Sequence, residues 1–171
     1  MQMVKKSGIA LLVAWFAILV LMPKQEFYYK LEQVLAEHEI ELNEEKMDEG
    51  FFSLNLHQVT VYFKGIPVAT IEEMDLCTLL FYSSLELQGL HMDDSLKRMV
   101  PQETQKALLS HTILSPLKVS VDAQGSFGGM TGAIDLNARK VHLDFNESKN
   151  IEMLKPQLKK SEKGWIYETS F

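Results

Sequence analysis

The sequence predicts a mainly β fold with an N-terminal transmembrane helix, in which a curved, mostly antiparallel sheet of about seven strands is accompanied by short helices. Two observations carry this prediction. Residues 7–22 contain no charged side chain and follow directly on Lys5 and Lys6. After Gly50, apolar residues recur at every second position, which is the periodicity of a strand with one buried face. Few of these segments are separated by a helix long enough for a parallel crossover, so the sheet is expected to be mainly antiparallel.

The apolar run has the composition of an uncleaved membrane anchor. Its sixteen residues would span about 24 Å as a helix, slightly less than the hydrocarbon layer of about 30 Å. It ends Val20-Leu21-Met22-Pro23-Lys24, with bulky residues where a signal peptidase requires small ones. A buried core helix is disfavoured because apolar side chains cover every face of the run. We expect residues 1–23 to form a cytoplasmic tail and anchor, and residues 24–171 to form one β-rich domain outside the cytoplasm.

The charge of this domain argues against nucleic acid as a partner. The chain has 17 basic and 23 acidic residues, and two of the basic ones precede the anchor, so the domain carries a net charge of about −8. Nucleic-acid binding requires neutralisation of phosphates. A broad electrostatic attachment to anionic lipid headgroups is disfavoured for the same reason. The single cysteine, Cys77, lies in an apolar run and is expected to be a buried small hydrophobe.

The first segments of the domain differ in periodicity. Residues 24–38 place Phe27, Leu31, Val34 and Leu35 at helical spacing, which predicts a helix. Residues 37–49 are dominated by acids and are interpreted as a solvated face or an edge strand, in preference to a cation or partner site.

Two changes of parity interrupt the alternation that follows. Apolar residues occupy even positions up to Leu56 and odd positions from Val59, which predicts one extra residue, a β-bulge, near Gln58. A second change occurs beside Gly89. Bulges and glycines of this kind bend a sheet, so curvature is expected.

The later segments predict a crossing helix and several clear strands. Residues 93–111 lose the alternation, and Pro101 is expected to open a short helix that carries Ala107 and neighbouring leucines. Residues 117–124 alternate cleanly. Residues 134–145 predict a hairpin with its turn on Ala138 and Arg139, which would place Leu136 opposite Val141. Residues 147–160 suggest a short helix near Pro156, before a closing strand with one apolar side that carries Trp165, Tyr167, Thr169 and Phe171.

No group of residues predicts chemistry: we assign no catalytic, cofactor-binding or metal-binding residue. The five histidines are scattered, without the spacing that places two ligands on one helix face. The glycines of residues 125–132 precede a strand and lack the Gly-Lys-Ser/Thr ending of a phosphate loop, so turns and bulges are favoured. Asp122, Asp135 and Asp144 alternate toward the wet side of their strands.

The layout resembles a known family. The residues that carry the likeness are Gly50-Phe51-Phe52-Ser53-Leu54, Leu85-Glu86-Leu87-Gln88-Gly89-Leu90, and the run from Val119 to Gly129 followed by Gly132-Ala133-Ile134-Asp135-Leu136. With the N-terminal anchor, they resemble the type II secretion system protein N group (GspN), which in turn is similar to AsmA-like envelope proteins. The resemblance implies a periplasmic, curved β-sheet protein held in the bacterial inner membrane by a single pass, and it supplies no catalytic motif.

Two functions follow from these expectations. The first is a non-enzymatic accessory or scaffold component of a type II secretion-like apparatus, which would bind secretion-system or other envelope proteins through a strand edge or the acidic residues 37–49. The alternative is a lipid or lipopolysaccharide carrier, AsmA-like or LptC-like, that holds acyl chains on the dry face of the sheet. An enzyme is the weakest interpretation.

Overall fold

The computed structural model describes residues 7, 9, 11, 13–17, 24–79, 81–96, 99–148, 151–152, 154–161 and 164–171. Half of the predicted anchor, residues 7–22, falls outside this set. In the part of the chain that is described, no helix combines the length and the apolar character needed to cross a membrane.

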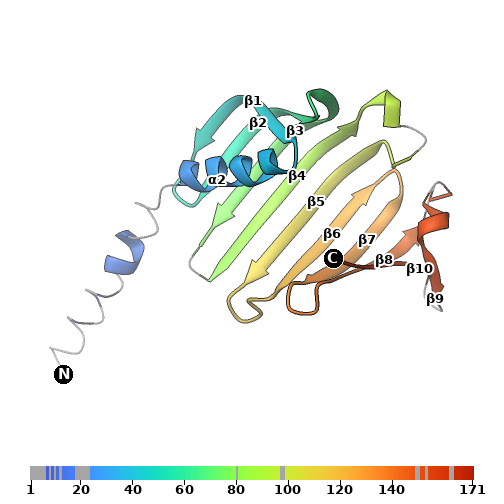
Figure 1. The fold of residues 1–171 in the computed structure, drawn as a ribbon. Coiled ribbons are helices and arrows are strands. Elements are labelled where there is room, and N and C mark those ends of the chain that lie inside the picture. The colour runs from blue at the N-terminus through green and yellow to red at the C-terminus, as the bar shows by residue number, and fades with distance from the viewer. Residues whose placement is uncertain are drawn as a thin grey trace.

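The described chain folds into one open antiparallel sheet whose ten strands follow each other in space almost as they do in sequence (Figure 1). Only the last two exchange places, giving the order β1-β2-β3-β4-β5-β6-β7-β8-β10-β9. The elements are α2 (Lys24–Glu37), β1 (Ile40–Glu49), β2 (Ser53–Phe63), β3 (Ile66–Thr78), β4 (Tyr82–Met92), η1 (Asp94–Leu96), β5 (Glu103–Thr112), β6 (Lys118–Gly125), β7 (Gly128–Asp135), β8 (Lys140–Ser148), η2 (Lys155–Gln157), β9 (Lys159–Ser161) and β10 (Gly164–Ser170), where η marks a 3-10 turn.

The mainly β, antiparallel prediction is confirmed, but the count of about seven strands is wrong. Two of the ten strands, β5 and β9, had no strand pattern in the sequence, whereas the acidic residues 37–49 are interpreted from the sequence as a solvated face or an edge strand. β1 is the acidic segment, and it is an edge strand paired only with β2. β9 is only three residues long and has no apolar alternation to detect.

The prediction of a short helix after Pro101 is also wrong, because this segment is a strand. Residues 103–112 form β5, which pairs along its length with β4 and β6. The strand is not recognised in the sequence because it contains three consecutive apolar residues, Ala107, Leu108 and Leu109, which obscure a period of two. Leu108 lies opposite Glu86 and Asp122, on the side of the sheet that carries charges, whereas its two neighbours lie on the other side.

The two other predicted helical segments are present in the structure. Residues 24–37 form helix α2, and Pro156 lies at the start of the single turn η2. The hairpin between β7 and β8 is real, but Ile134 rather than Leu136 lies opposite Val141. The turn is longer than expected because Asp135 Oδ1 accepts a hydrogen bond of 2.8 Å from the Ala138 N–H, which stabilises a local turn.

The sheet has one apolar face and one polar face. The apolar face has two buried clusters, centred on β2 and β3 (Leu54, Leu56, Val59, Ile71, Met74) and on β6 to β8 (Ala123, Phe127, Phe145). The polar face carries His57, Glu73, Gln88, Lys106 and Gln124, which lie opposite one another on β2 to β6. Helix α2 crosses the apolar face over the first strands, and the segment around η2 lies beside the last ones (Figure 1).

The parity changes seen in the sequence belong to a single line across the sheet. Glu45, Gln58, Glu72, Gly89 and Gln105 lie opposite one another on β1 to β5, and each pairing skips them. We call these five residues the slip line. The predicted change at Gln58 is confirmed, but β1 to β5 gain no residue relative to one another there, because all five strands slip together. At the slip line β5 carries one extra residue, Gln105, relative to β6, and further register shifts lie between β2 and β3 and between β7 and β8.

The slip requires left-handed backbone at alternate strands. Gln58 has a φ of 51° and Gly89 a φ of 61°. A Cβ atom at Gly89 would lie 2.6 Å from side-chain atoms of Glu72. Glycine tolerates this conformation, whereas glutamine is strained in it.

Substitutions on the slip line are expected to change stability in opposite directions. Gln58→Gly relieves a left-handed residue and raises the free energy of unfolding by up to about 1 kcal/mol, whereas Gly89→Ala lowers it by about 1–2 kcal/mol. Gln88→Gly, one position from the line, is the matched control and lowers it by about 0.5–1 kcal/mol. Urea unfolding curves measure all three. A loss of stability in Gln58→Gly equal to that in Gln88→Gly would contradict the strain.

Candidate functional site

Helix α2 covers one end of the apolar face and is fastened there by Tyr28. The Tyr28 side chain is 0% exposed and packs in the cluster of β2 and β3. Its hydroxyl donates a hydrogen bond of 2.7 Å to Glu44 Oε2 on β1. Burial and the Glu44 carboxylate both raise the pKa of the Tyr28 phenol far above its usual value. Burial, followed by the charge of Glu44, also raises the pKa of Glu32.

Polar contacts at the first turn of α2 complete this fastening. Lys24 is buried to 5% exposure, and its Nζ lies 3.5 Å from Glu49 Oε1 at the end of β1. Gln25 Nε2 donates to the other oxygen of the same carboxylate at 3.1 Å. Removal of the carboxylate would leave the buried ammonium of Lys24 uncompensated, which strongly lowers the stability of a fold. The helix is therefore held to the edge strand at two points.

A second, smaller cover lies over β7, β8 and β10. Ile151 is 4% exposed and packs with Phe127 and Phe145, whose rings meet edge to face at 6.2 Å. Leu154 and Leu158, on either side of η2, pack against the same cluster.

Between the two covers the apolar face contains a cavity of about 330 Å³. It opens over β4 to β8, and ten of its eleven lining residues are apolar, the exception being Thr104: Leu90, Met92, Val100, Pro101, Thr104, Ala107, Ala123, Phe127, Met130, Phe145 and Leu154. This volume lies at the lower end of the range for small-molecule sites, which are typically concave and mostly apolar. We call this the distal cavity.

A second hollow of about 200 Å³ lies further along the same strands, next to the turns that join β3 to β4 and β5 to β6. Leu76, Leu85, Leu109 and Val119 line it from the apolar face. Half-buried apolar side chains join the two hollows, since Leu85 lies opposite Leu109 and Leu87 lies opposite Ala107. The described apolar surface is therefore continuous from Leu85 and Leu109 to the distal cavity, whereas Thr78, Ser83 and His111 make the row next to the turns polar.

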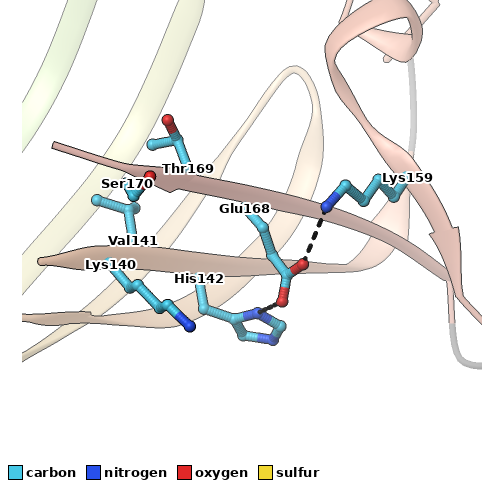
Figure 2. Close-up of a pocket in the computed structure, with 7 residues that line it drawn as sticks. All are labelled: Lys140, Val141, His142, Lys159, Glu168, Thr169 and Ser170. Carbon is cyan, nitrogen blue, oxygen red and sulfur yellow. Dashed lines mark hydrogen bonds and ion pairs between the residues drawn. The ribbon is translucent and has the colours of Figure 1, made fainter. Parts of the chain in front are cut away.

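A third hollow, of about 240 Å³, lies over the last strands, β8, β9 and β10, and six of its seven lining residues have polar side chains (Figure 2). His142 Nδ1 lies 3.1 Å from Glu168 Oε1 and its Nε2 lies 3.1 Å from Asp144, while Lys159 Nζ lies 3.2 Å from the other Glu168 oxygen. The hydrogen bond from Lys159, and then that from His142, lower the pKa of Glu168. Because both ring nitrogens of His142 meet carboxylates, the imidazole is not directed at a nucleophile.

The histidines do not gather in one place, and two of them lie near single carboxylates: His57 is 3.4 Å from Asp48 and His91 is 3.8 Å from Glu72. His57, His91, His111 and His142 lie on four different strands. Among the described residues, no group of three or more histidine, cysteine or carboxylate side chains has the geometry to hold a metal ion. Asp122 and Asp144 lie on the polar face on either side of Thr131, as expected, and Asp135 stabilises its turn.

Two expectations about single residues need correction. Cys77 is only half-buried, on a strand position between Ser53 and Ser84, and burial followed by the charge of Asp75 raises the pKa of its thiol. In α2, Val34 is 47% exposed and the residue buried against the sheet is Tyr28. The helical spacing of Leu31 and Leu35 with Tyr28 was the pattern that could have found it.

Comparison of the chain with protein-family models, with curated proteins and with solved structures finds no match.

Alkaline pH is expected to loosen α2 through Tyr28. Unfolded tyrosine loses its proton near pH 10, whereas the folded phenol keeps its proton to higher pH. The folded state then binds more protons, so the free energy of unfolding falls as the pH rises above about 10. In Tyr28→Phe this part of the pH dependence disappears, and stability at pH 7 drops by about 1.5–3 kcal/mol with the lost bond to a carboxylate.

Urea unfolding at neutral and alkaline pH measures both effects. Tyr29→Phe is the control, because Tyr29 is 53% exposed. An alkaline slope that is the same in Tyr28→Phe and Tyr29→Phe would show that Tyr28 titrates normally.

Proposed function

We propose that this protein is a non-enzymatic, membrane-tethered protein of the bacterial envelope that holds lipid acyl chains on the open apolar face of its sheet. The observation that carries the proposal is the distal cavity of about 330 Å³, which continues into an apolar surface that neither cover closes. Lipids and lipopolysaccharide both contain acyl chains, so the shared chemistry is a saturated hydrocarbon chain.

The lining of the distal cavity favours a hydrocarbon over a polar ligand. Among the described residues that line it, Thr104 alone has a polar side chain and none is charged. A ligand with hydrogen-bonding groups would leave those groups unsatisfied, which costs free energy in an apolar site. Each methylene removed from water contributes about 0.8 kcal/mol, so a long chain can bind without any polar contact.

The tether and the compartment rest on the sequence. Residues 7–22 have the composition of an anchor, and Lys5 and Lys6 favour a cytoplasmic N-terminus. The resemblance to GspN and AsmA-like proteins agrees with a periplasmic domain on the inner membrane. The described residues of the run support this proposal, since Ile9, Leu11 and Val13 are apolar and 60–73% exposed.

Filling the distal cavity is expected to displace the lipid. Ala107→Phe adds an aromatic ring at a lining position, whereas Leu108→Phe adds a ring at the next residue, which lies on the polar face. The full chain is purified from membranes in mild detergent, and bound lipid is quantified by native mass spectrometry. We expect phospholipid or glycolipid with the unaltered chain and with Leu108→Phe, and several-fold less with Ala107→Phe. Absence of lipid from all three would refute the proposal.

A scaffold role in a type II secretion-like apparatus is the second candidate, and the free edge of β1 favours it. β1 pairs only with β2, and its outward row of backbone groups can accept an added strand. Five of its ten residues are acidic and only Lys46 is basic, so a basic partner strand is favoured.

Photo-crosslinking tests this candidate. A photo-reactive residue replaces Asn43, which is exposed on β1, or Thr131, which lies in the middle of the sheet on β7. If β1 is a docking edge, the probe at Asn43 captures envelope or secretion-system proteins in intact cells, and the probe at Thr131 captures none. Equal capture at both positions would argue against the edge.

A further inference from the structure

One end of the sheet gathers exposed apolar side chains from several connections. In an antiparallel meander, alternate turns lie at the same end of the sheet. The connections between β1 and β2, β3 and β4, β5 and β6, and β7 and β8 therefore share one end with the C-terminus of β10. We call this the proximal end. In Figure 1 these turns follow the lower left border of the sheet.

The tips at the proximal end are apolar and exposed. Leu114 is 92% exposed, which leaves almost the whole side chain in contact with solvent. At least one such residue comes from each of the four connections and from the C-terminus: Phe51 (73%), Phe81 (58%), Ile113 (51%), Leu114, Leu117 (50%), Leu136 (46%) and Phe171 (63%). Single exposed hydrophobes are ordinary, but a row of them along one border marks an interaction surface.

The opposite end has a different character. Among the described residues of its connections and the adjoining strand ends, the exposed large apolar side chains are Phe63, Ile66 and Met99. Phe63 and Ile66 flank Lys64, which forms an ion pair of 3.0 Å with Glu39, and Asp93 and Asp94 begin the next connection. At the connection of β6 to β7, Phe127 turns inward and is 5% exposed.

The N-terminal apolar run meets the sheet at the proximal end. The ring of Phe16 lies against that of Phe52, at 6.1 Å and edge to face. Lys24, the first residue of α2, pairs with Glu49 at the end of β1. The described turn of helix at residues 13–17 lies beyond this border of the sheet (Figure 1). The exposed tips and the predicted anchor are therefore continuous.

We infer that the proximal end rests on a lipid bilayer, with the apolar tips inserted among the acyl chains and the strands rising from the membrane surface. Lys118, Arg139 and Lys140 flank the tips at the level where anionic headgroups would lie. In this orientation the hollow beside Leu85 and Leu109 borders the membrane, and the distal cavity lies further from it. The inference rests on the tether in the proposed function, but not on bound lipid.

Spin labels at the two ends test this orientation. The full chain first has its own cysteine removed by Cys77→Ser. One new cysteine then replaces Leu114 or, as the matched control, Met99, which is 66% exposed in the connection between β4 and β5 at the opposite end. Each protein is reconstituted into vesicles of phosphatidylethanolamine and phosphatidylglycerol. Collisions of the label with oxygen, which concentrates in the bilayer, and with a water-soluble nickel chelate are measured by electron paramagnetic resonance.

Bilayer insertion predicts that the label at Leu114 collides several-fold more with oxygen and several-fold less with the chelate than the label at Met99. Equal values at the two positions, in protein that floats with the vesicles, would overturn this orientation and leave the tether intact. A Leu114 label shielded from both reagents would also overturn it, because a protein partner or a second copy would then cover the tips. Protein that fails to float would refute both the tether and the orientation.

Discussion

The fold depends on keeping one continuous apolar face across strands that cannot each follow a simple period of two. A parity change in one strand alone would place its polar side chains beside the apolar ones of its neighbours. The slip line solves this problem because Glu45, Gln58, Glu72, Gly89 and Gln105 change parity side by side. The left-handed backbone at Gln58 and Gly89 is the local cost of this arrangement.

An apolar sheet face must be covered, and in the described structure the cover lies over the first strands and over the last strands. Tyr28 and Lys24 fasten α2 over the first strands, and Ile151 packs over the last ones. The side chains between them, such as Leu87 and Met130, stay half-buried in the described structure. An open apolar band reduces the stability that full burial would give, and bands of this kind usually serve binding. The incomplete cover therefore favours a ligand-holding role over a purely structural one.

The sequence predicts strands well where one residue in two is apolar, and poorly where another constraint dominates. β2, β4, β6 and β10 follow this pattern. β1 does not show the alternation because edge strands carry charged residues. β5 does not show it because Leu108 is an apolar residue on the polar face. The distal cavity could not be predicted from the sequence. Its lining residues come from β4 to β8 and from the segment around η2, and only the register of the strands brings them together. The parity changes were visible, but their alignment into one line requires the pairing.

The slip line also explains how the proximal end and the distal cavity can share one surface. The hollow beside Leu85 lies on one side of the line, and the distal cavity, with Leu90 and Met92, lies on the other. Without the slip, alternation from Leu85 and Leu87 would continue to Gly89 and His91, and a polar side chain would interrupt the apolar face there. With it, Leu90 lies opposite Ile71 on the apolar face. A hydrocarbon chain that lies beside Leu85 and Leu109 can then reach the distal cavity without crossing a polar row at the slip line.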